Sequence, residues 1–186
     1  TAASSALTIS GTVGGQTLTL TGNGTLSAGA DVGTNKTINT SGLTLGNGSG
    51  GTAGVATNYS LVGGTYQMNV TQRPVTISGS RFYDGTSNVS SSDISTFNNR
   101  SGSETLTITG SGSLTNAIAG SGKVISLGTL QLSDGSGSAS NYSLSSGTFT
   151  VNARQLNVSG SRLYDNTTVV NGADLVVTTG VGSELI

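Results

Sequence analysis

Residues 73 to 84 read Arg-Pro-Val-Thr-Ile-Ser-Gly-Ser-Arg-Phe-Tyr-Asp, and 81 positions later residues 154 to 165 read Arg-Gln-Leu-Asn-Val-Ser-Gly-Ser-Arg-Leu-Tyr-Asp. Within each copy apolar residues alternate with polar ones, the pattern of a β-strand with one buried face. Each copy ends in Tyr-Asp followed by Gly85 or Asn166, residue types that adopt the positive φ angles of tight turns. The stretch therefore predicts a strand that runs into a turn.

Other segments recur as well, so the chain is a degenerate tandem repeat. The segment Gln16–Leu26 returns as Glu104–Leu114, an offset of 88 residues, and Asn58–Leu61 returns as Asn141–Leu144, an offset of 83. A period this long suits a small autonomous domain rather than the rung of a β-helix. We predict a partial repeat over 1–72 that lacks its opening strand, a complete repeat over 73–152 and the first part of a third over 153–186. They are called the first, middle and last repeats below. We expect the sequence to be a window from a longer polypeptide.

Alternating runs place the other strands, and no apolar period is long enough to predict a helix. The remaining runs that we predict as strands are 16–21, 105–109, 123–132, 142–144 and 148–151. Glycine pairs such as Asn23-Gly24 and Asn47-Gly48 punctuate the runs and predict turns. Six or seven short strands in about 83 residues are typical of an antiparallel sandwich. The predicted fold is all-β: small antiparallel β-sandwich (Ig-like) domains in tandem, forming an elongated rod.

Composition excludes most chemistries. The 186 residues include 30 glycines but no Cys, His or Trp, only 8% are charged, and the net charge is −1. Without Cys or His there is no Ser-His-Asp triad, Cys nucleophile or zinc finger. The chain has no basic face that could neutralise a run of phosphates, so we do not expect it to bind nucleic acid. No apolar run approaches 18 residues, so we expect no membrane insertion. We predict no catalytic residue, metal site or cofactor.

The motifs in this order resemble the YDG-type repeats of large bacterial surface adhesins, such as filamentous-haemagglutinin-like exoproteins. Tyr83-Asp84-Gly85-Thr86 follows a Val-Thr-Ile-Ser strand, Gly42–Leu45 and Asn58–Leu61 occur in the first repeat, and Arg73-Pro74 begins the next. The resemblance covers essentially the whole chain. It departs at Asn166, which replaces the glycine of Tyr-Asp-Gly. It implies an extracellular, bacterial cell-surface location, adhesion or matrix architecture and no enzymatic activity, without implying a ligand.

The Tyr-Asp motifs have a structural and a functional interpretation. Structurally, Asp84 and Asp165 accept bonds in the turn, Gly85 and Asn166 take the left-handed conformation, and Tyr83 and Tyr164 pack on the domain end. We also expect Arg81 and Arg162 to pair with those aspartates. Functionally, Tyr83, Asp84 and Tyr142 would form a ligand contact. We favour the structural interpretation.

Asn-X-Ser/Thr sequences offer sites for N-glycosylation. Asn23 and Asn47 are the best candidates because we place them in loops.

Three functions remain. The first is a structural spacer that carries a surface adhesin or matrix filament in cell adhesion or biofilm architecture, with neighbouring repeats of the same chain as its partners. The second is a module that binds glycans or a host protein directly. The third is a filament that associates with like filaments through its sheet edges.

Overall fold

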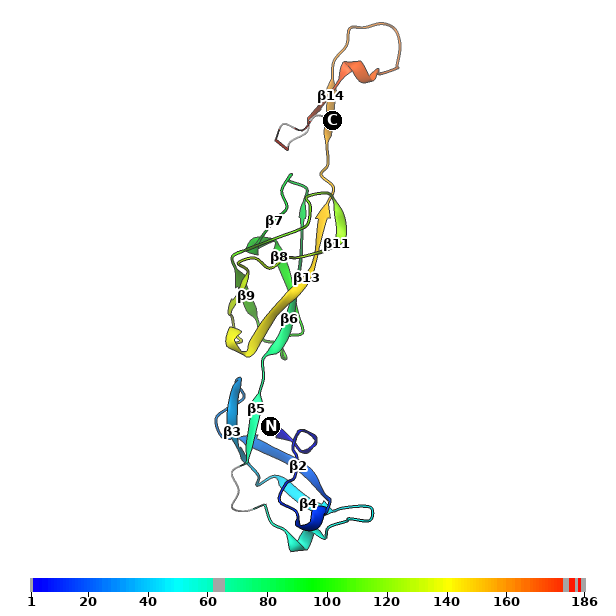
Figure 1. Cartoon of the computed structure of the whole chain (residues 1–186). Helices are drawn as coiled ribbons and strands as arrows, with labels where there is room; N and C mark the ends of the chain where they lie inside the picture. Colours follow the sequence, from blue (N-terminus) through cyan, green and yellow to red (C-terminus); the bar gives the residue numbers. More distant parts are fainter. Residues whose placement is uncertain (1, 62–65, 179–180, 183, 185–186) are drawn as a thin grey trace. The chain divides into compact units, whose positions relative to one another are not determined.

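The computed structural model describes residues 2–61, 66–178, 181, 182 and 184. Within these residues the regular elements are strands and short 3₁₀ turns (Figure 1). The chain divides into two compact units, Thr1–Gln72 and Arg73–Ile186. All-β secondary structure, the coarser part of the predicted fold, is confirmed.

The first unit centres on one long strand. Strand β2 (Leu18–Leu26) pairs antiparallel with β1, β3 and β4, and β3 also pairs antiparallel with β5. Among the described residues of this unit, Ile38 and Leu43 are the buried apolar side chains. The other elements are β1 (Ala2–Ala3), η1 (Ser4–Ala6), η2 (Val13–Gly15), β3 (Gly33–Asn39), β4 (Leu43–Asn47), η3 (Ala56–Asn58) and β5 (Gln67–Val70).

The second unit contains a four-stranded sheet in the order β11-β13-β6-β8. Two antiparallel ladders, β7–β10 and β9–β12, belong to the same repeat, and β14 pairs antiparallel with β15 in the last repeat. The bounds are β6 (Arg73–Phe82), β7 (Asn88–Ser90), η4 (Ser91–Asp93), β8 (Ile94–Asn98), β9 (Leu106–Thr109), β10 (Ser111–Ser113), β11 (Gly120–Val124), β12 (Gln131–Asp134), η5 (Ala139–Asn141), β13 (Tyr142–Asn152), β14 (Asn157–Gly160), η6 (Gly172–Asp174) and β15 (Leu175–Thr178).

One pairing corrects the antiparallel prediction. Strands β6 and β13, the first and last strands of the middle repeat, lie side by side and run parallel (Figure 1). The register joins Tyr142 to Arg73 at one end and Asn152 to Phe82 at the other. The other described ladders are antiparallel. The chain therefore enters and leaves the middle repeat at opposite ends of one ladder.

Three of the predicted runs are divided differently in the structure. The run 123–132 divides into β11 and β12, because Gly128 at φ +55° turns the chain between two different ladders. Conversely, 142–144 and 148–151 belong to the single strand β13, whose register shifts between Ser145 and Thr148.

The core of the middle repeat joins its sheet to its ladders. Phe149, Ile77 and Val151 of the sheet are at most 2% exposed and pack in one cluster with apolar side chains from outside the sheet, including Val89 of β7. A smaller cluster joins Val75 of β6 to the buried residues of β9 and β13, Leu106 and Tyr142.

Candidate functional site

The Tyr-Asp-Gly motif follows β6 and connects it to β7. Gly85 has φ +78°, a region that side chains other than glycine, Asn and Asp rarely adopt. The backbone N–H and the hydroxyl of Thr86 donate to Asp84 Oδ1 at 2.9 and 3.0 Å. Asp84 thus closes the turn through its side chain, the geometry by which aspartate stabilises turns.

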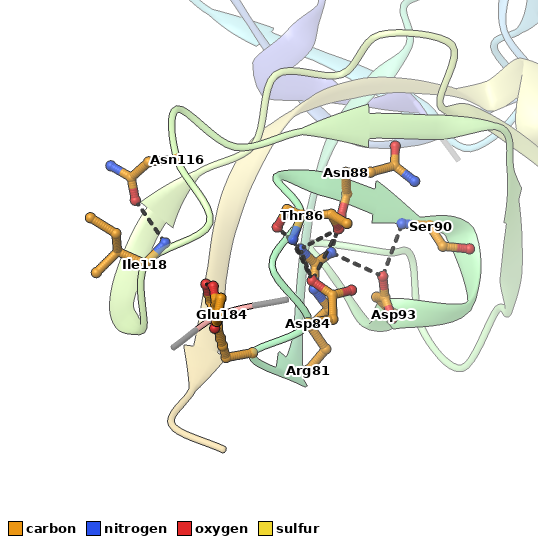
Figure 2. Close-up of polar contacts among 10 residues, drawn as sticks. Arg81, Asp84, Thr86, Asn88, Ser90, Asp93, Asn116, Ile118 and Glu184 are labelled. Carbon is orange, nitrogen blue, oxygen red and sulfur yellow. Dashed lines mark hydrogen bonds and ion pairs between the residues drawn. The ribbon is translucent and has the colours of Figure 1, made fainter. Parts of the chain in front are cut away.

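Arg81 connects this turn to the rest of the domain (Figure 2). Its guanidinium donates to the carbonyl oxygens of Asn88 and Thr86, and lies 3.3 Å from an oxygen of Asp84 and 3.6 Å from one of Asp93. The side chain is only 10% exposed, and its guanidinium carbon lies 5.8 Å from the ring centroid of Phe149. Among the described residues, Arg81 Nε is a buried side-chain atom without a hydrogen-bond partner.

Asp93 has a second role beyond its ion pair with Arg81. Its Oδ2 accepts from the backbone N–H of Ser90 at 2.9 Å and completes the capping box of η4. Sequence reasoning missed this partner of Arg81. The Ser90-x-x-Asp93 spacing is close to the capping-box pattern and could have indicated that Asp93 bonds back to Ser90.

The same arrangement recurs in the last repeat. Arg162 donates to Asp165 at 2.9 Å and to the carbonyl of Val169 at 2.6 Å, and the Thr167 N–H donates to Asp165 at 3.0 Å. Asn166 has φ 58°, so asparagine occupies the left-handed position that Gly85 takes in the middle repeat. Both Arg–Asp pairs expected from the sequence are present. The motif forms whether its surroundings are buried or exposed, so it is a locally determined turn.

The two motif tyrosines differ in their surroundings. Tyr83 is half-buried and packs against the main core cluster, whereas Tyr164 is 90% exposed. The Tyr83 hydroxyl donates to the carboxylate of Glu184, and this hydrogen bond, with burial, raises the pKa of Tyr83. Tyr83 also lines a hollow of about 320 Å³ together with Ile118, Arg154 and Leu156.

Tyr142 holds the opposite end of the β6–β13 ladder. Its hydroxyl donates to the Glu104 carboxylate and accepts from the Ser101 N–H at 3.1 Å. In the first unit, Tyr59 likewise donates to Gln16 at 2.6 Å and accepts from the Val13 N–H at 3.1 Å. In both repeats the tyrosine hydroxyl therefore bonds within its own domain. That Gln16 and Glu104 are its partners was not predicted from the sequence.

The structure does not bring the three predicted ligand contacts together. Tyr83 donates its N–H to the Asn152 carbonyl at one end of the β6–β13 ladder, whereas Tyr142 pairs with Arg73 at the other. Ten residues of strand correspond to about 30 Å. Tyr83 and Asp84 are neighbours, but Tyr142 belongs to a different end of the domain.

The two glycosylation candidates lie in strands and not in loops, which corrects the sequence expectation. Asn23 lies within β2 and its N–H donates to the Gly42 carbonyl at 3.0 Å. The Asn23-Gly24 pair makes no turn because β2 continues to Leu26. Asn47 ends β4, and its side-chain oxygen accepts from the Ala56 N–H at 2.8 Å.

The described residues contain no group of three or more acidic side chains placed to bind a metal ion. A helix long and apolar enough to cross a membrane was also not found among them.

Acidification tests the role of Asp84. Partial burial favours the neutral carboxyl, but the hydrogen bonds from Thr86 and the charge of Arg81 outweigh it and hold the pKa of Asp84 below its usual range. This stabilisation is present above the unfolded-state pKa of about 3.9 and is lost as the pH falls through the lower folded-state pKa. In the natural chain, we expect protonation of Asp84 below pH 4 to lower the free energy of unfolding by less than about 1 kcal/mol, because the side chain is 44% exposed. Asp84→Asn should abolish this part of the acid destabilisation. Urea unfolding of the natural chain and the variant at pH 2.5 and 6 measures the change. If the free energy of unfolding falls equally in both proteins between pH 6 and pH 2.5, Asp84 does not have this role.

The middle of the chain, which includes the Tyr-Asp-Gly turn, is similar to a known domain family. Residues 65–149 match the model of the YDG domain, so the chain carries a YDG-type domain there. Comparisons with curated proteins and with solved structures gave no match.

Proposed function

We propose that the chain consists of structural stalk repeats of a bacterial surface adhesin or an extracellular matrix filament, supporting cell adhesion or biofilm architecture. In this proposal, Ig-like β-sandwich domains follow one another as an elongated rod outside the cell. Each repeat has the neighbouring repeats of its chain as partners, and the chain has no enzymatic role, no cofactor and no nucleic-acid or membrane partner. Its task is to carry tension between the cell and a binding region elsewhere.

The observation that carries the proposal is the parallel pairing of β6 and β13. These strands open and close the middle repeat, and their ladder extends from Tyr142–Arg73 to Asn152–Phe82. Tension that enters at Arg73 and leaves at Asn152 would load the whole ladder along its length, so its hydrogen bonds would have to break together. A domain whose first and last strands are sheared resists force better than one whose strands are peeled apart singly.

The polar motif residues give further support because they contact their own domain. Arg81 bonds to the two carbonyls and two carboxylates that surround it, and Tyr142 bonds to Glu104 and Ser101. Because these groups are bonded within the domain, they stabilise it and are not available to bind a ligand.

A second candidate function is direct binding of a glycan or host protein. The hollow lined by Tyr83 and Arg154 favours it, since Tyr and Arg are enriched among residues that dominate binding energy.

Binding measurements separate the two functions. The full chain, and the same chain with Tyr83→Ala, would be tested on a glycan array and on intact cells at physiological salt. The stalk function predicts no saturable binding by either protein. Saturable binding by the chain that Tyr83→Ala weakens tenfold or more would overturn it in favour of the binding module.

A further inference from the structure

One Asn-X-Ser/Thr sequence lies at an exposed turn of the first unit. Asn39 is the last residue of β3, and Thr40 and Ser41 lead through the turn to β4. The Leu43 N–H donates to the Thr40 carbonyl at 2.8 Å and closes this turn. Asn39 and Ser41 are both exposed, so the two side chains that define an N-glycosylation acceptor reach solvent together.

The side chain of Asn39 folds back onto its own acceptor sequence. Its Oδ1 accepts from the backbone N–H of Ser41 at 3.0 Å, which is an Asx turn. Among the described residues, the amide nitrogen Nδ2 of Asn39 has no hydrogen-bond partner. The bond therefore holds the amide beside the residue that carries the hydroxyl and leaves the nitrogen free to react.

Backbone contacts with β2 hold this turn in place. Asn39 pairs with Thr25 of β2, and the Gly42 carbonyl accepts from the Asn23 N–H at 3.0 Å. A Cβ at Gly42 would stand 2.3 Å from the Asn23 carbonyl oxygen, so the turn lies directly against the strand. The acceptor sequence is therefore presented in one fixed conformation at the end of a sheet.

The exposure belongs to this position of the fold in both repeats. Thr25 of the first repeat corresponds to Ser113 of the middle repeat. Ser113 pairs with Ser126, so Ser126 is the counterpart of Asn39. Ser126 and Gly128 are also exposed, although they lie within the complete middle repeat. The position is therefore open to an enzyme, and of these two repeats the first carries the acceptor sequence there.

Other acceptor sequences of the chain have their asparagine side chains or backbone bonded elsewhere. The Asn47 Oδ1 accepts from the Ala56 N–H at 2.8 Å, and the Asn99 Nδ2 donates to the Pro74 carbonyl at 2.8 Å. Asn23 lies inside the extended strand β2, which has paired backbone on both of its edges. A transferase would have to break these bonds or open the strand before it could use these sites.

We propose that Asn39 is an N-glycosylation site whose substrate is a sugar activated by a phosphate at its anomeric carbon. In the transfer, Nδ2 of Asn39 forms a bond to the anomeric carbon. The bond from that carbon to the phosphate oxygen breaks, its electron pair leaves on the phosphate, and one amide proton passes to a basic group of the transferase. The sugar would add polar bulk to a chain in which only 8% of residues are charged. The inference is independent of the stalk function.

Sugar transfer to the folded chain tests the site. Two transferases that recognise Asn-X-Ser/Thr would be used, one supplied with UDP-glucose and one with a lipid-linked oligosaccharide, and the attached mass tells the two donors apart. Each must first modify a digest of the chain at Asn23, Asn39 and Asn47. In the folded chain we expect sugar at Asn39 and at least tenfold less at the other two, as measured by peptide mass mapping. An unmodified Asn39, or equal modification of all three, would overturn the proposal.

Two variants test the acceptor hydroxyl without altering the turn. Ser41→Ala removes the hydroxyl but keeps the backbone N–H that bonds to Asn39, so transfer to Asn39 should fall at least tenfold. Thr40→Ala is the matched control and should be modified like the natural chain, because the middle residue of the acceptor sequence is not specified. Urea unfolding checks that both variants fold. Undiminished transfer to the Ser41→Ala chain would show that Asn39 is not recognised as an acceptor.

A second Asx turn allows the geometry to be tested by gain of a site. The Ile118 N–H donates to Asn116 Oδ1 at 3.2 Å, so Asn116 has the same turn but no hydroxyl two residues later (Figure 2). Lys123 donates to the same oxygen at 2.6 Å, and Ile118 is 67% exposed. Ile118→Thr should therefore make Asn116 an acceptor for the same transferases. If Asn116 is then modified no more than Asn23, the turn does not select the site and the assignment of Asn39 fails.

Discussion

Replacing Arg81 with alanine is expected to lower the free energy of unfolding of the middle repeat by about 3 kcal/mol. The change removes the donor to two backbone carbonyls and leaves the Asp84 and Asp93 carboxylates without their cation. It also removes the contact with the Phe149 ring. The cost is large because the Arg81 side chain is only 10% exposed, so water replaces these partners poorly.

The last repeat supplies the control for this experiment. Arg162 makes the matching bonds with a side chain that is 26% exposed, paired with an Asp165 that is 50% exposed. Arg162→Ala should therefore cost less than about 1 kcal/mol. Urea unfolding of the two variants measures both changes. Equal losses, or a loss below 1 kcal/mol for Arg81→Ala, would show that the buried network does not stabilise the domain.

Replacing Gly147 with alanine is expected to destabilise the same domain by about 3 kcal/mol. Gly147 lies at the register shift of β13 against β6, and a Cβ there would stand 1.6 Å from the Ile77 carbonyl oxygen. Backbone cannot yield as a flexible side chain does, so the two strands would have to separate locally.

Gly120→Ala is the matched control because it lies in the same sheet. A Cβ at Gly120 would meet its nearest neighbour at 3.7 Å, an ordinary contact distance. We expect a change below about 1 kcal/mol for this variant, measured by the same denaturation. A Gly147→Ala protein as stable as the Gly120→Ala protein would contradict the close parallel approach of β6 and β13.

The sequence predicted local features well. Alternation placed strands such as β2, β6, β9 and β14, because a half-buried strand needs apolar side chains at every second position. It did not predict several others, among them β3, β5, β7, β8, β10 and β15. The Arg81–Asp84 and Arg162–Asp165 pairs followed from short separation in the chain and from the turn that positive φ at Gly85 and Asn166 produces.

Strand partners were harder to predict than strand positions. Alternation determines which face of β6 is buried, but it carries no information on whether β13 lies beside it or in which direction. The Asp93 partner of Arg81 lies 12 residues away and depends on where η4 packs. The ligand set of Tyr83, Asp84 and Tyr142 failed to assemble for a similar reason, since the parallel ladder places Tyr142 at the other end.

The most direct test of the stalk function is to stretch single molecules of the chain by its two ends. The parallel β6–β13 ladder predicts one discrete event in which residues 73–152 unfold, lengthening the molecule by about 240 Å at full extension. Its force should exceed by several-fold the force needed when handles at Arg73 and Tyr142 peel the ladder from one end. Gradual extension without such an event, or equal forces in the two pulling directions, would contradict a load-bearing role.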